Sequence, residues 1–303
     1  MTQSLPRSYQ RAVFKALNSN LVLEEVPLTL PGPGEILVKT EACGICHSDV
    51  FAQENTFGVS FPRVPGHEII GKIVAVGERV LDWKCKIGQT QMCRTASYNG
   101  ITRDGGLAEY CLLLASAAVH VPIEGDAAKL AHLLCAGSTV FLALKSANIT
   151  PGQPVAIQGL AAMMCYRVIA ISRGTAKEAE ARSLGAHDYI DATKGDVGDQ
   201  LWALGGAQLA LTTALGLRSC GKLLVVTGVP GPITIDGTAM IMRGISVRAW
   251  PCPSVLDNEQ TMEFSQIRKI DCTVETFPLN CAQDAYDAML KGTVRFRAVV
   301  TMD

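Results

Sequence analysis

The chain has 303 residues, which suits two domains at the usual ~100–200 residues each. Hydrophobic residues make up 48% and charged residues 18%, and the net charge of −1 gives no electrostatic reason to expect nucleic acid or an anionic membrane as a partner. Residues 1–18 contain no continuous apolar signal segment, and no uncharged apolar run reaches the ~18–20 residues that span a bilayer. We therefore expect a soluble, cytoplasmic protein that binds neither nucleic acid nor membrane.

The first part of the chain is rich in short, strand-like runs. They are separated by turn residues such as the Pro-Gly-Pro-Gly sequence at 31–34. The runs cover residues 12–14, 21–23, 35–39, 72–76, 110–114 and 118–121. This pattern predicts a small β-barrel.

The pattern changes near residue 126. Residues 126–134 and 138–147 have apolar side chains at helical spacing, and a helix at 175–184 is ended by Gly185. Short apolar runs alternate with helix-like or turn segments after residue 151, which predicts a parallel sheet with helices on its faces. These runs cover residues 154–158, 166–172, 186–190, 208–212, 223–228 and 245–249. The chain then closes with a helix from about 257, a strand at 274–277, a helix at 282–291 and a strand at 296–301.

Residues 43–77 carry the clearest chemical signal. Cys46 and His67 offer a thiolate and an imidazole, the ligands that Zn²⁺ prefers, and catalytic zinc sites use three protein ligands with one position open. Cys135, where the β-rich part ends, is the best candidate for the third ligand. Taken alone, the pair Cys43-x-x-Cys46 is also compatible with a redox pair or with no function. The sequence Gly66-His67-Glu68 that follows it favours catalytic zinc.

Neighbouring polar residues fit the chemistry of such a site. Glu68 directly follows His67 and is a candidate exchangeable ligand, and Asp49 is a candidate to accept the second ring N–H of His67. A zinc ion here would polarise an alcohol or carbonyl oxygen and lower the pKa of a bound hydroxyl. Ser48 has a hydroxyl that can pass the proton on toward His47.

The other cysteines carry a weaker signal. The chain has 11 cysteines and no signal segment, so we expect thiols, metal ligands or small core residues instead of a disulfide framework. A second, structural zinc needs four cysteines in one lobe, and only Cys85 and Cys93 occupy the right region, so that site is predicted to be absent or incomplete. Most of the remaining cysteines are expected to be buried apolar residues, namely Cys165, Cys220, Cys252, Cys272 and Cys281.

With these motifs the sequence resembles a zinc-dependent medium-chain alcohol dehydrogenase. The resemblance rests on Cys43-Gly44-Ile45-Cys46-His47-Ser48-Asp49, on Gly66-His67-Glu68-x-x-Gly71-x₅-Gly77 and on Leu134-Cys135-Ala136-Gly137, and it runs on to residues 294–300. It implies an α/β protein with a GroES-like β-barrel catalytic domain at 1–138, a Rossmann-like nucleotide-binding domain at 139–252, and a return to the catalytic domain at 253–303. It also implies hydride transfer between an alcohol or carbonyl and a nicotinamide.

The resemblance further implies roles for single residues. Cys46, His67 and Cys135 would be the zinc ligands, with Glu68 able to enter the coordination shell and Ser48 as proton relay. His47 and Arg297 would contact the cofactor pyrophosphate, and Thr139 would lie against the nicotinamide. A small primary alcohol or its aldehyde is the expected substrate, with a specialised metabolite carbonyl as the main alternative. The family commonly pairs through sheet edges, here near residues 245–249, which implies a homo-oligomer.

Cofactor choice is expected to depend on the end of the second strand of the nucleotide-binding domain, where a carboxylate would hold the ribose of NAD. Here the turn reads Ser172-Arg173-Gly174, with no carboxylate, and Arg173 is available for a 2′-phosphate, with Lys177 one turn further on. This favours NADP over NAD, although an exposed Arg173 with no cofactor role is nearly as well supported. Of the expected Gly-x-Gly-x-x-Gly fingerprint only Gly159 is present, because Ala161 and Met164 occupy the next two glycine positions.

The chain is shorter than expected at three connections. About eight residues, 158–165, separate the first two strands of the nucleotide-binding domain, whereas a parallel crossover with its helix takes at least ~10–12 residues. Two more shortenings lie at 212–222 and at 84–92. Three interpretations follow: a working dehydrogenase with two crossover helices truncated, a zinc protein without redox activity, or an incomplete gene model or splice form of a dehydrogenase.

Overall fold

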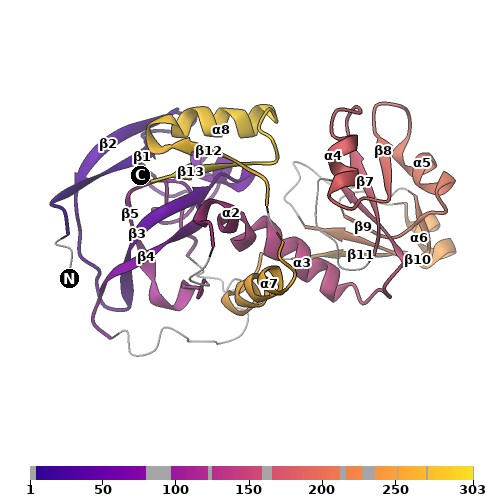
Figure 1. Cartoon of the computed structure of the whole chain (residues 1–303), viewed down its shortest axis with the longest axis horizontal. Coiled ribbons are helices and arrows are strands. Elements are labelled where there is room, and N and C mark those ends of the chain that lie inside the picture. Colours follow the sequence, from indigo (N-terminus) through magenta and orange to yellow (C-terminus); the bar gives the residue numbers. More distant parts are fainter. Residues whose placement is uncertain are drawn as a thin grey trace. The chain divides into compact units, whose positions relative to one another are not determined.

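In the computed structural model, the chain forms two compact units (Figure 1). The first unit comprises Met1–Ser138 and Pro253–Asp303, and the second comprises Thr139–Cys252. The structure describes residues 5–79, 97–121, 125–158, 166–211, 216–226, 236–250, 252–270 and 272–302. The predicted shortening at 84–92 lies outside the described residues, as do Cys85 and Cys93, whose structural-zinc site is predicted to be absent or incomplete.

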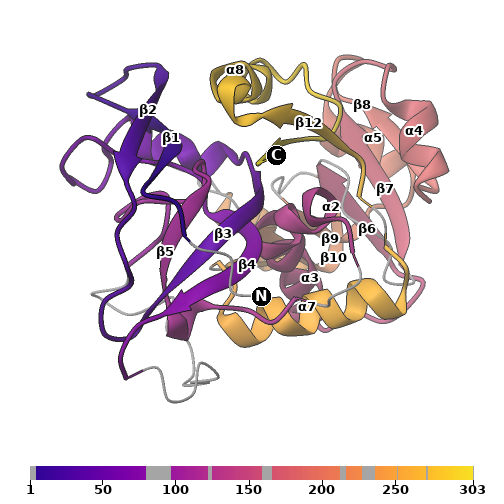
Figure 2. The same ribbon diagram turned by 60° about the vertical axis from the view of Figure 1, so that its left-hand side comes forward.

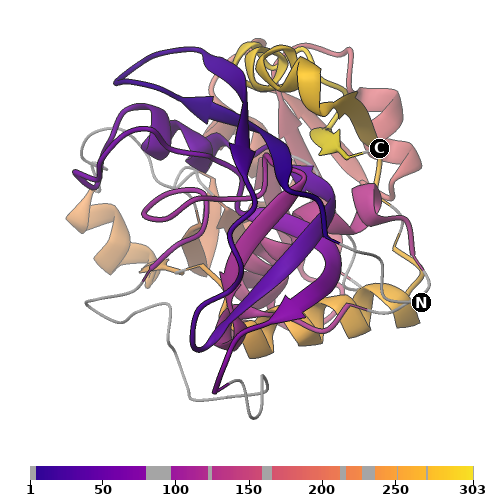
Figure 3. The ribbon, with the colours of Figure 1, turned by 90° about the vertical axis from the view of Figure 1, so that its left-hand side faces the viewer.

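The first unit is built on a five-stranded sheet in which one long strand has three partners (Figure 3). This strand, β3 (Glu35–Gly44), pairs antiparallel with β4 (Glu68–Val76), β5 (Tyr110–Leu114) and β13 (Arg297–Thr301). On the far side of β13, β12 (Val274–Pro278) adds a parallel partner, so the last part of the chain completes the sheet begun by the first. A separate antiparallel hairpin is formed by β1 (Ser8–Phe14) and β2 (Leu21–Pro27).

The core of the first unit joins this hairpin to the C-terminal helix α8 (Ala282–Lys291), which lies beside β12 and β13 (Figure 2). Phe14 and Tyr286 are fully buried and meet edge to face with ring centroids 5.6 Å apart. Because a buried phenol needs a hydrogen-bond partner, Tyr286 Oη pairs with Gln53 Oε1 at 2.9 Å. Gly292, with φ of 65°, ends α8 in the left-handed conformation that favours glycine.

Several helical segments connect the strands of the first unit. Asp126 caps α2 by accepting a hydrogen bond from Ala128 N, and Ser254 and Asp257 form a capping box at the start of α7. α2 and the turn after it pack through Ala131 and Leu133 against the sheet. These segments are η1 (His47–Asp49), α1 (Val50–Gln53), η3 (Ala115–Ala117), α2 (Ala127–Ala131), η4 (His132–Leu134), α7 (Val255–Ile267) and η5 (Leu279–Cys281).

The second unit is a six-stranded parallel sheet in the order β11-β10-β9-β6-β7-β8. Counted along the chain, this is the order 3-2-1-4-5-6 of a dinucleotide-binding sheet, read from β8. The predicted parallel, Rossmann-like sheet is therefore confirmed. Its strands are β6 (Pro154–Gln158), β7 (Arg167–Ser172), β8 (Asp188–Asp191), β9 (Ala207–Leu211), β10 (Leu217–Val225) and β11 (Ser246–Ala249).

Both faces of this sheet are covered. Alternate residues of a strand point to opposite faces, and Val155 and Ile157 accordingly share one apolar cluster with Leu144, whereas Ala156 shares another with Leu201. The first cluster includes residues of α3 (Ala136–Ser146) and α4 (Glu178–Ser183), and the second includes residues of α5 (Val197–Ala203). One more helix, α6 (Gly237–Arg243), precedes β11. The sequence did not define α5 and α6, which are short and weakly patterned.

Two connections between neighbouring parallel strands are short. Residues 159–166 join β6 to β7 and residues 212–216 join β9 to β10, fewer than the dozen or so that a parallel crossover usually takes. The register of β10 also shifts between Leu217 and Lys222, where Cys220 has φ of 58°. β10 begins six residues before the start of the run predicted at 223–228. The predicted shortenings lie largely outside the described residues.

One predicted strand is wrong. Residues 118–121 form no strand, although the run is apolar. Ala118 instead packs, with Ala115 of η3, against Ile36 and Val38 of β3. The apolar character of this run therefore reflects packing under a loop.

The cysteines and the helices bear on two further expectations. All eight described cysteines are free thiols, and the expectation of buried apolar cysteines is wrong for Cys220 and Cys252, which are exposed. Cys272 and Cys281 are half-buried, and Cys272 packs against the apolar cluster that contains Ala131 and Leu133. Cys220 lies in the part of β10 where the register shifts. Cys165 is outside the described residues. No single helix in the described part of the chain is long and apolar enough to cross a bilayer, and only the bent pair formed by residues 127–134 and 136–146 would be.

Candidate active site

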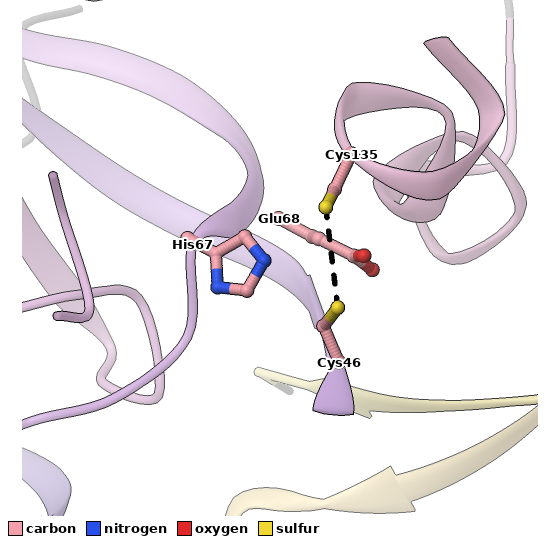
Figure 4. Close-up of side chains that lie close together, drawn as sticks. All are labelled: Cys46, His67, Glu68 and Cys135. Carbon is pink, nitrogen blue, oxygen red and sulfur yellow. Dashed lines mark hydrogen bonds between the residues drawn. The ribbon is translucent and has the colours of Figure 1, made fainter. Parts of the chain in front are cut away.

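Four side chains converge in the first unit to form one cluster of potential metal ligands (Figure 4). Cys46, His67, Glu68 and Cys135 each offer one ligand atom, and these atoms all lie within 4.8 Å of one another. Cys46 lies just before η1, and Cys135 directly follows η4. Glu68 is the first residue of β4, and His67 directly precedes it. We call these four residues the metal cluster.

The pairing of β3 with β4 explains how distant residues meet here. The register places Gly44 opposite Glu68, so the end of β3 brings Cys46 next to the start of β4. A Cβ atom at Gly44 would lie 2.0 Å from Glu68 Oε2, and one at Gly66 would lie 2.6 Å from Cys43 Sγ. Gly66 also has φ of 93°. Both positions therefore require glycine for the strands to close around the cluster.

Asp49 ties the two ligand-bearing loops together. Its carboxylate is fully buried and accepts hydrogen bonds from Cys46 N at 2.9 Å and from Gly66 N at 3.1 Å. Asp49 Oδ1 also lies 3.0 Å from His67 Nδ1. An acceptor at Nδ1 favours the tautomer that is protonated there, which leaves Nε2 of His67 with a free lone pair for a metal.

Glu68 is held by an arginine from the other end of the chain. Arg297 Nη2 donates to Glu68 Oε1 at 2.6 Å, and the Glu68 side chain is fully buried. Burial raises the pKa of Glu68 to about 7, although the positive charge of Arg297 opposes the shift. The sequence did not reveal this pair, because its two members are 229 positions apart.

The cluster fits a zinc ion on two observations. Glu68 Oε2 and His67 Nε2 are buried and have no hydrogen-bond partner among the described residues. Cys46 Sγ and Cys135 Sγ are 3.9 Å apart, and two sulfurs bound to one tetrahedral zinc at about 2.3 Å would be separated by about 3.8 Å. The hydrogen bond with Cys135 also holds the pKa of Cys46 well below its usual range, against the effect of burial. The set of two sulfurs and one nitrogen is typical of catalytic zinc.

The other predicted residues of the first unit lie near this cluster without joining it. Ser48 is half-buried and His47 is exposed, and both lie on η1 directly after Cys46. Within the described residues, neither side chain hydrogen-bonds to the cluster. Arg297 contacts Glu68, as described above. The predicted contacts of His47 and Arg297 with a cofactor pyrophosphate stay predictions.

The predicted cofactor residues of the second unit lie at several places. Thr139 is buried in α3, and Gly159 is outside the described residues. Ser172 ends β7 and is half-buried, and Arg173 and Lys177 after it are exposed. In the part of the chain that the structure describes, the side chains of Arg173 and Lys177 have no ion-pair partner. A parallel sheet in this strand order binds nucleotides at the carboxyl ends of its strands, which is where these two cations lie.

A carboxylate that the sequence did not identify adjoins this turn. Asp191, at the end of β8, accepts a hydrogen bond from Gly174 N at 2.7 Å. It was missed because the turn itself contains no acidic residue and Asp191 follows it by 17 positions. The sequence does contain a signal for this contact, because Asp191 directly follows the strand-like run at 186–190, where a parallel neighbour of the strand at 166–172 would end.

Comparison with known proteins identifies relatives over the whole chain. Residues 32–123 match the family described as Alcohol dehydrogenase GroES-like domain. Alcohol dehydrogenase notN of Aspergillus sp. (strain MF297-2) is 47% identical over 339 aligned positions, which cover 99% of this chain and 100% of the relative. Those 339 positions exceed the 303 residues of this chain by 36, so at least that many positions of the alignment are gaps in this chain.

Solved structures share the fold. The alcohol dehydrogenase of the archaeon Aeropyrum pernix matches with a TM-score of 0.87 and 23% identity, over 96% of this chain and 99% of the other. Acetophenone reductase from Geotrichum candidum, solved in complex with NAD, matches with a TM-score of 0.83 and 23% identity, over 99% and 98% of the two chains.

Proposed function

The chain belongs to the zinc-dependent medium-chain alcohol dehydrogenase family and is an oxidoreductase that interconverts an alcohol and an aldehyde or ketone, and we propose that it does so with one Zn²⁺ at the metal cluster and with NADP(H). The observation that carries the proposal is the convergence of Cys46, His67, Glu68 and Cys135 within 4.8 Å. No feature of the described residues favours a zinc protein without redox activity over this function.

Three residues hold the metal in this proposal: Cys46, His67 and Cys135. When bound, zinc supplies a Lewis acid that polarises the substrate oxygen. Asp49 keeps His67 in the tautomer that presents Nε2, and its hydrogen bonds to Cys46 N and Gly66 N fix the spacing of the two ligand loops. Glu68 stays paired with Arg297 and supplies an exchangeable oxygen beside the three metal-holding residues.

Proton transfer falls to the turn that follows Cys46. Ser48 is half-buried, and its hydroxyl both accepts and donates, so it takes the alcohol proton when an alcohol is oxidised. His47, the neighbouring exposed residue, passes that proton to solvent. In the reverse direction the same two groups supply the proton to the carbonyl oxygen.

The cofactor preference rests on the carboxyl end of β7. Arg173 and Lys177 are exposed there, and a guanidinium pairs with a phosphate through two parallel hydrogen bonds. The carboxylate that adjoins this turn, Asp191, is already engaged in hydrogen bonds to Gly174 and Thr193. We therefore assign NADP(H) in preference to NAD(H), with a small primary alcohol or its aldehyde as the default substrate and a specialised metabolite carbonyl as the alternative.

A homo-oligomer is proposed from β11, the edge strand of the parallel sheet within the described residues. β11 is the last strand in the sheet order, and most of its residues are exposed. Ile241 and Met242, on the preceding helix, are 83% and 79% exposed. An edge strand that has one partner among the described residues, beside exposed apolar side chains, is suited to pairing with the same strand of a second copy. Light scattering of the purified chain should give about twice the monomer mass if this pairing forms.

Metal content and nucleotide binding test the proposed function. The purified chain should contain about one zinc by elemental analysis, as expected for a single three-ligand site. Isothermal titration of the zinc-loaded protein should show saturable binding of NADPH, and weaker binding of NADH. Cys111→Ala is a matched control because Cys111 is a buried cysteine outside the cluster, and this variant should keep its zinc. Absence of binding by both nucleotides would contradict the oxidoreductase assignment for this chain.

A further inference from the structure

The turn after β7 is tied to the end of β8 by three hydrogen bonds. Gly174 N donates to Asp191 Oδ1 at 2.7 Å, Tyr189 Oη donates to Gly174 O at 2.7 Å, and Ala192 N donates to Ser172 O at 2.8 Å. Gly174 has φ of 70°, which favours glycine at this point of the turn. We call these contacts the β7–β8 clasp. The clasp fixes the backbone on both sides of Arg173.

The carboxylate in the clasp serves the fold of its own loop. Asp191 is only 7% exposed, and its Oδ1 also accepts hydrogen bonds from Thr193 N at 2.9 Å and Thr193 Oγ1 at 2.7 Å. These bonds from Thr193, together with the one from Gly174 N, hold the pKa of Asp191 below its usual range. Asp191 is therefore an ionised acceptor whose Oδ1 receives three hydrogen bonds, and the one from Gly174 N holds the turn after β7 against the end of β8.

The side chain of Arg173, beside the clasp, is available to bind a ligand. Arg173 is exposed, and in the described ranges its side chain makes no hydrogen bond or ion pair, whereas the residues on both sides of it are fixed. A loop that is fixed before a ligand arrives loses less conformational entropy on binding than a mobile one. The rigid turn thus places a free guanidinium at the sheet edge where nucleotides bind.

We propose that Asp191, with Tyr189, is a positioning residue that holds Arg173 for the 2′-phosphate of NADP(H) and thereby sets the preference for NADP(H) over NAD(H). The inference rests on the proposed function, because it concerns the cofactor of that reaction. Asp191 does not touch the cofactor. It acts through the backbone of Gly174, and Arg173 makes the bidentate contact with the phosphate.

The experiment compares two nucleotide fragments that differ only in the 2′-phosphate and undergo no redox reaction. Adenosine 2′,5′-bisphosphate and adenosine 5′-monophosphate are titrated into the full-length protein by calorimetry. The Kd of the monophosphate divided by the Kd of the bisphosphate measures recognition of the 2′-phosphate, and a larger ratio means stronger recognition. Since a hydrogen bond to a charged group contributes ~1.5–3 kcal/mol, Arg173→Ala should lower this ratio by at least about tenfold. Asp191→Ala should lower it by a similar factor, and the double variant should lower it no further than Arg173→Ala does.

Three further variants separate positioning from a general loss of stability. Asp188→Ala is the matched control, because Asp188 lies on the same strand and pairs with Arg167 at 2.8 Å without contacting the turn. Its Kd ratio should equal that of the wild type. Asp191→Asn keeps an oxygen acceptor for Gly174 N and should retain most of the preference. Tyr189→Phe removes one bond of the clasp, so it should shift the ratio in the same direction by less, and it serves as the test if Asp191→Ala does not fold.

The outcomes are distinguishable. A wild-type protein that prefers the bisphosphate and keeps the full preference in Asp191→Ala, or in Tyr189→Phe where the alanine variant does not fold, overturns the positioning role alone. Equal losses in Asp188→Ala and Asp191→Ala overturn it as well, because the effect would then follow from stability. A wild-type protein that binds neither fragment nor either intact cofactor overturns the proposed function and this inference together.

Discussion

The metal cluster and the β7 turn differ in how the chain holds their functional groups. In the metal cluster, residues from three distant segments are locked by buried hydrogen bonds, among them those of the fully buried Asp49. In the β7 turn, Arg173 is exposed, and only the backbone around it is fixed. The residues of the metal cluster are therefore held by the fold itself, whereas the side chain proposed to recognise the nucleotide, Arg173, makes no hydrogen bond or ion pair within the described ranges. Changes in the first should affect both metal binding and stability, and changes in the second only nucleotide binding.

The largest effect is expected at a metal ligand. Cys46→Ala removes one of the two sulfurs that lie 3.9 Å apart, so the cluster keeps one thiolate and one imidazole. Zinc affinity should fall by more than the ~10–100-fold loss that follows removal of an outer-shell partner. Competition with a chromogenic chelator measures it. An unchanged affinity would mean that the metal is held elsewhere.

Asp49→Ala should have the next largest effect, because it removes the hydrogen bonds that hold His67 and the two ligand-bearing loops in place. The variant leaves Cys46 N and Gly66 N buried without acceptors, each at a cost of ~1–3 kcal/mol, and zinc affinity should fall ~10–100-fold. Chemical denaturation measures the loss of stability, and competition with a chelator measures the loss of zinc affinity. Asp49→Asn replaces only one of the two acceptor oxygens and should fall between alanine and the wild type in both. A loss of stability without any loss of zinc affinity would break the proposed coupling.

The sequence was most informative where one segment contains the whole signal. The bounds of β5, β6 and α8 agree with the predicted runs, because each has a complete strand or helix pattern of its own. The four residues of the metal cluster were also proposed from sequence, since Cys46, His67 and Glu68 belong to recognisable motifs, although Cys135 lies 89 positions after Cys46. The partnership of Arg297 with Glu68 and the contact of Asp191 with Gly174 were not found. Each joins segments that are far apart in the sequence, and only the pairing of strands in the folded sheets brings them together.

Gly66→Ala tests whether backbone geometry, as well as ligand identity, positions His67. A Cβ atom there would lie 2.6 Å from Cys43 Sγ, at a φ of 93°. We expect destabilisation of ~1–3 kcal/mol, with weaker zinc binding because the adjacent His67 must shift. Gly34→Ala is the matched control: its φ is 78°, but nothing lies within 4 Å of its added Cβ. It should cost ~1 kcal/mol and leave zinc binding unchanged. Equal effects of the two variants would exclude the contact with Cys43 as the cause.

The smallest effect on stability is expected at the β7 turn. Arg173→Ala removes an exposed side chain that makes no ion pair in the described part of the chain, so the free energy of unfolding should change by less than ~0.5 kcal/mol. Zinc affinity should not change either, because Arg173 belongs to the second unit and the metal cluster to the first. Denaturant titration of the variant and the wild type, with chelator competition beside it, checks both expectations. A variant that lost stability or zinc would show that the turn is built into the fold as firmly as the metal cluster. A variant that kept both while losing preference for a 2′-phosphate would confine the role of Arg173 to recognition.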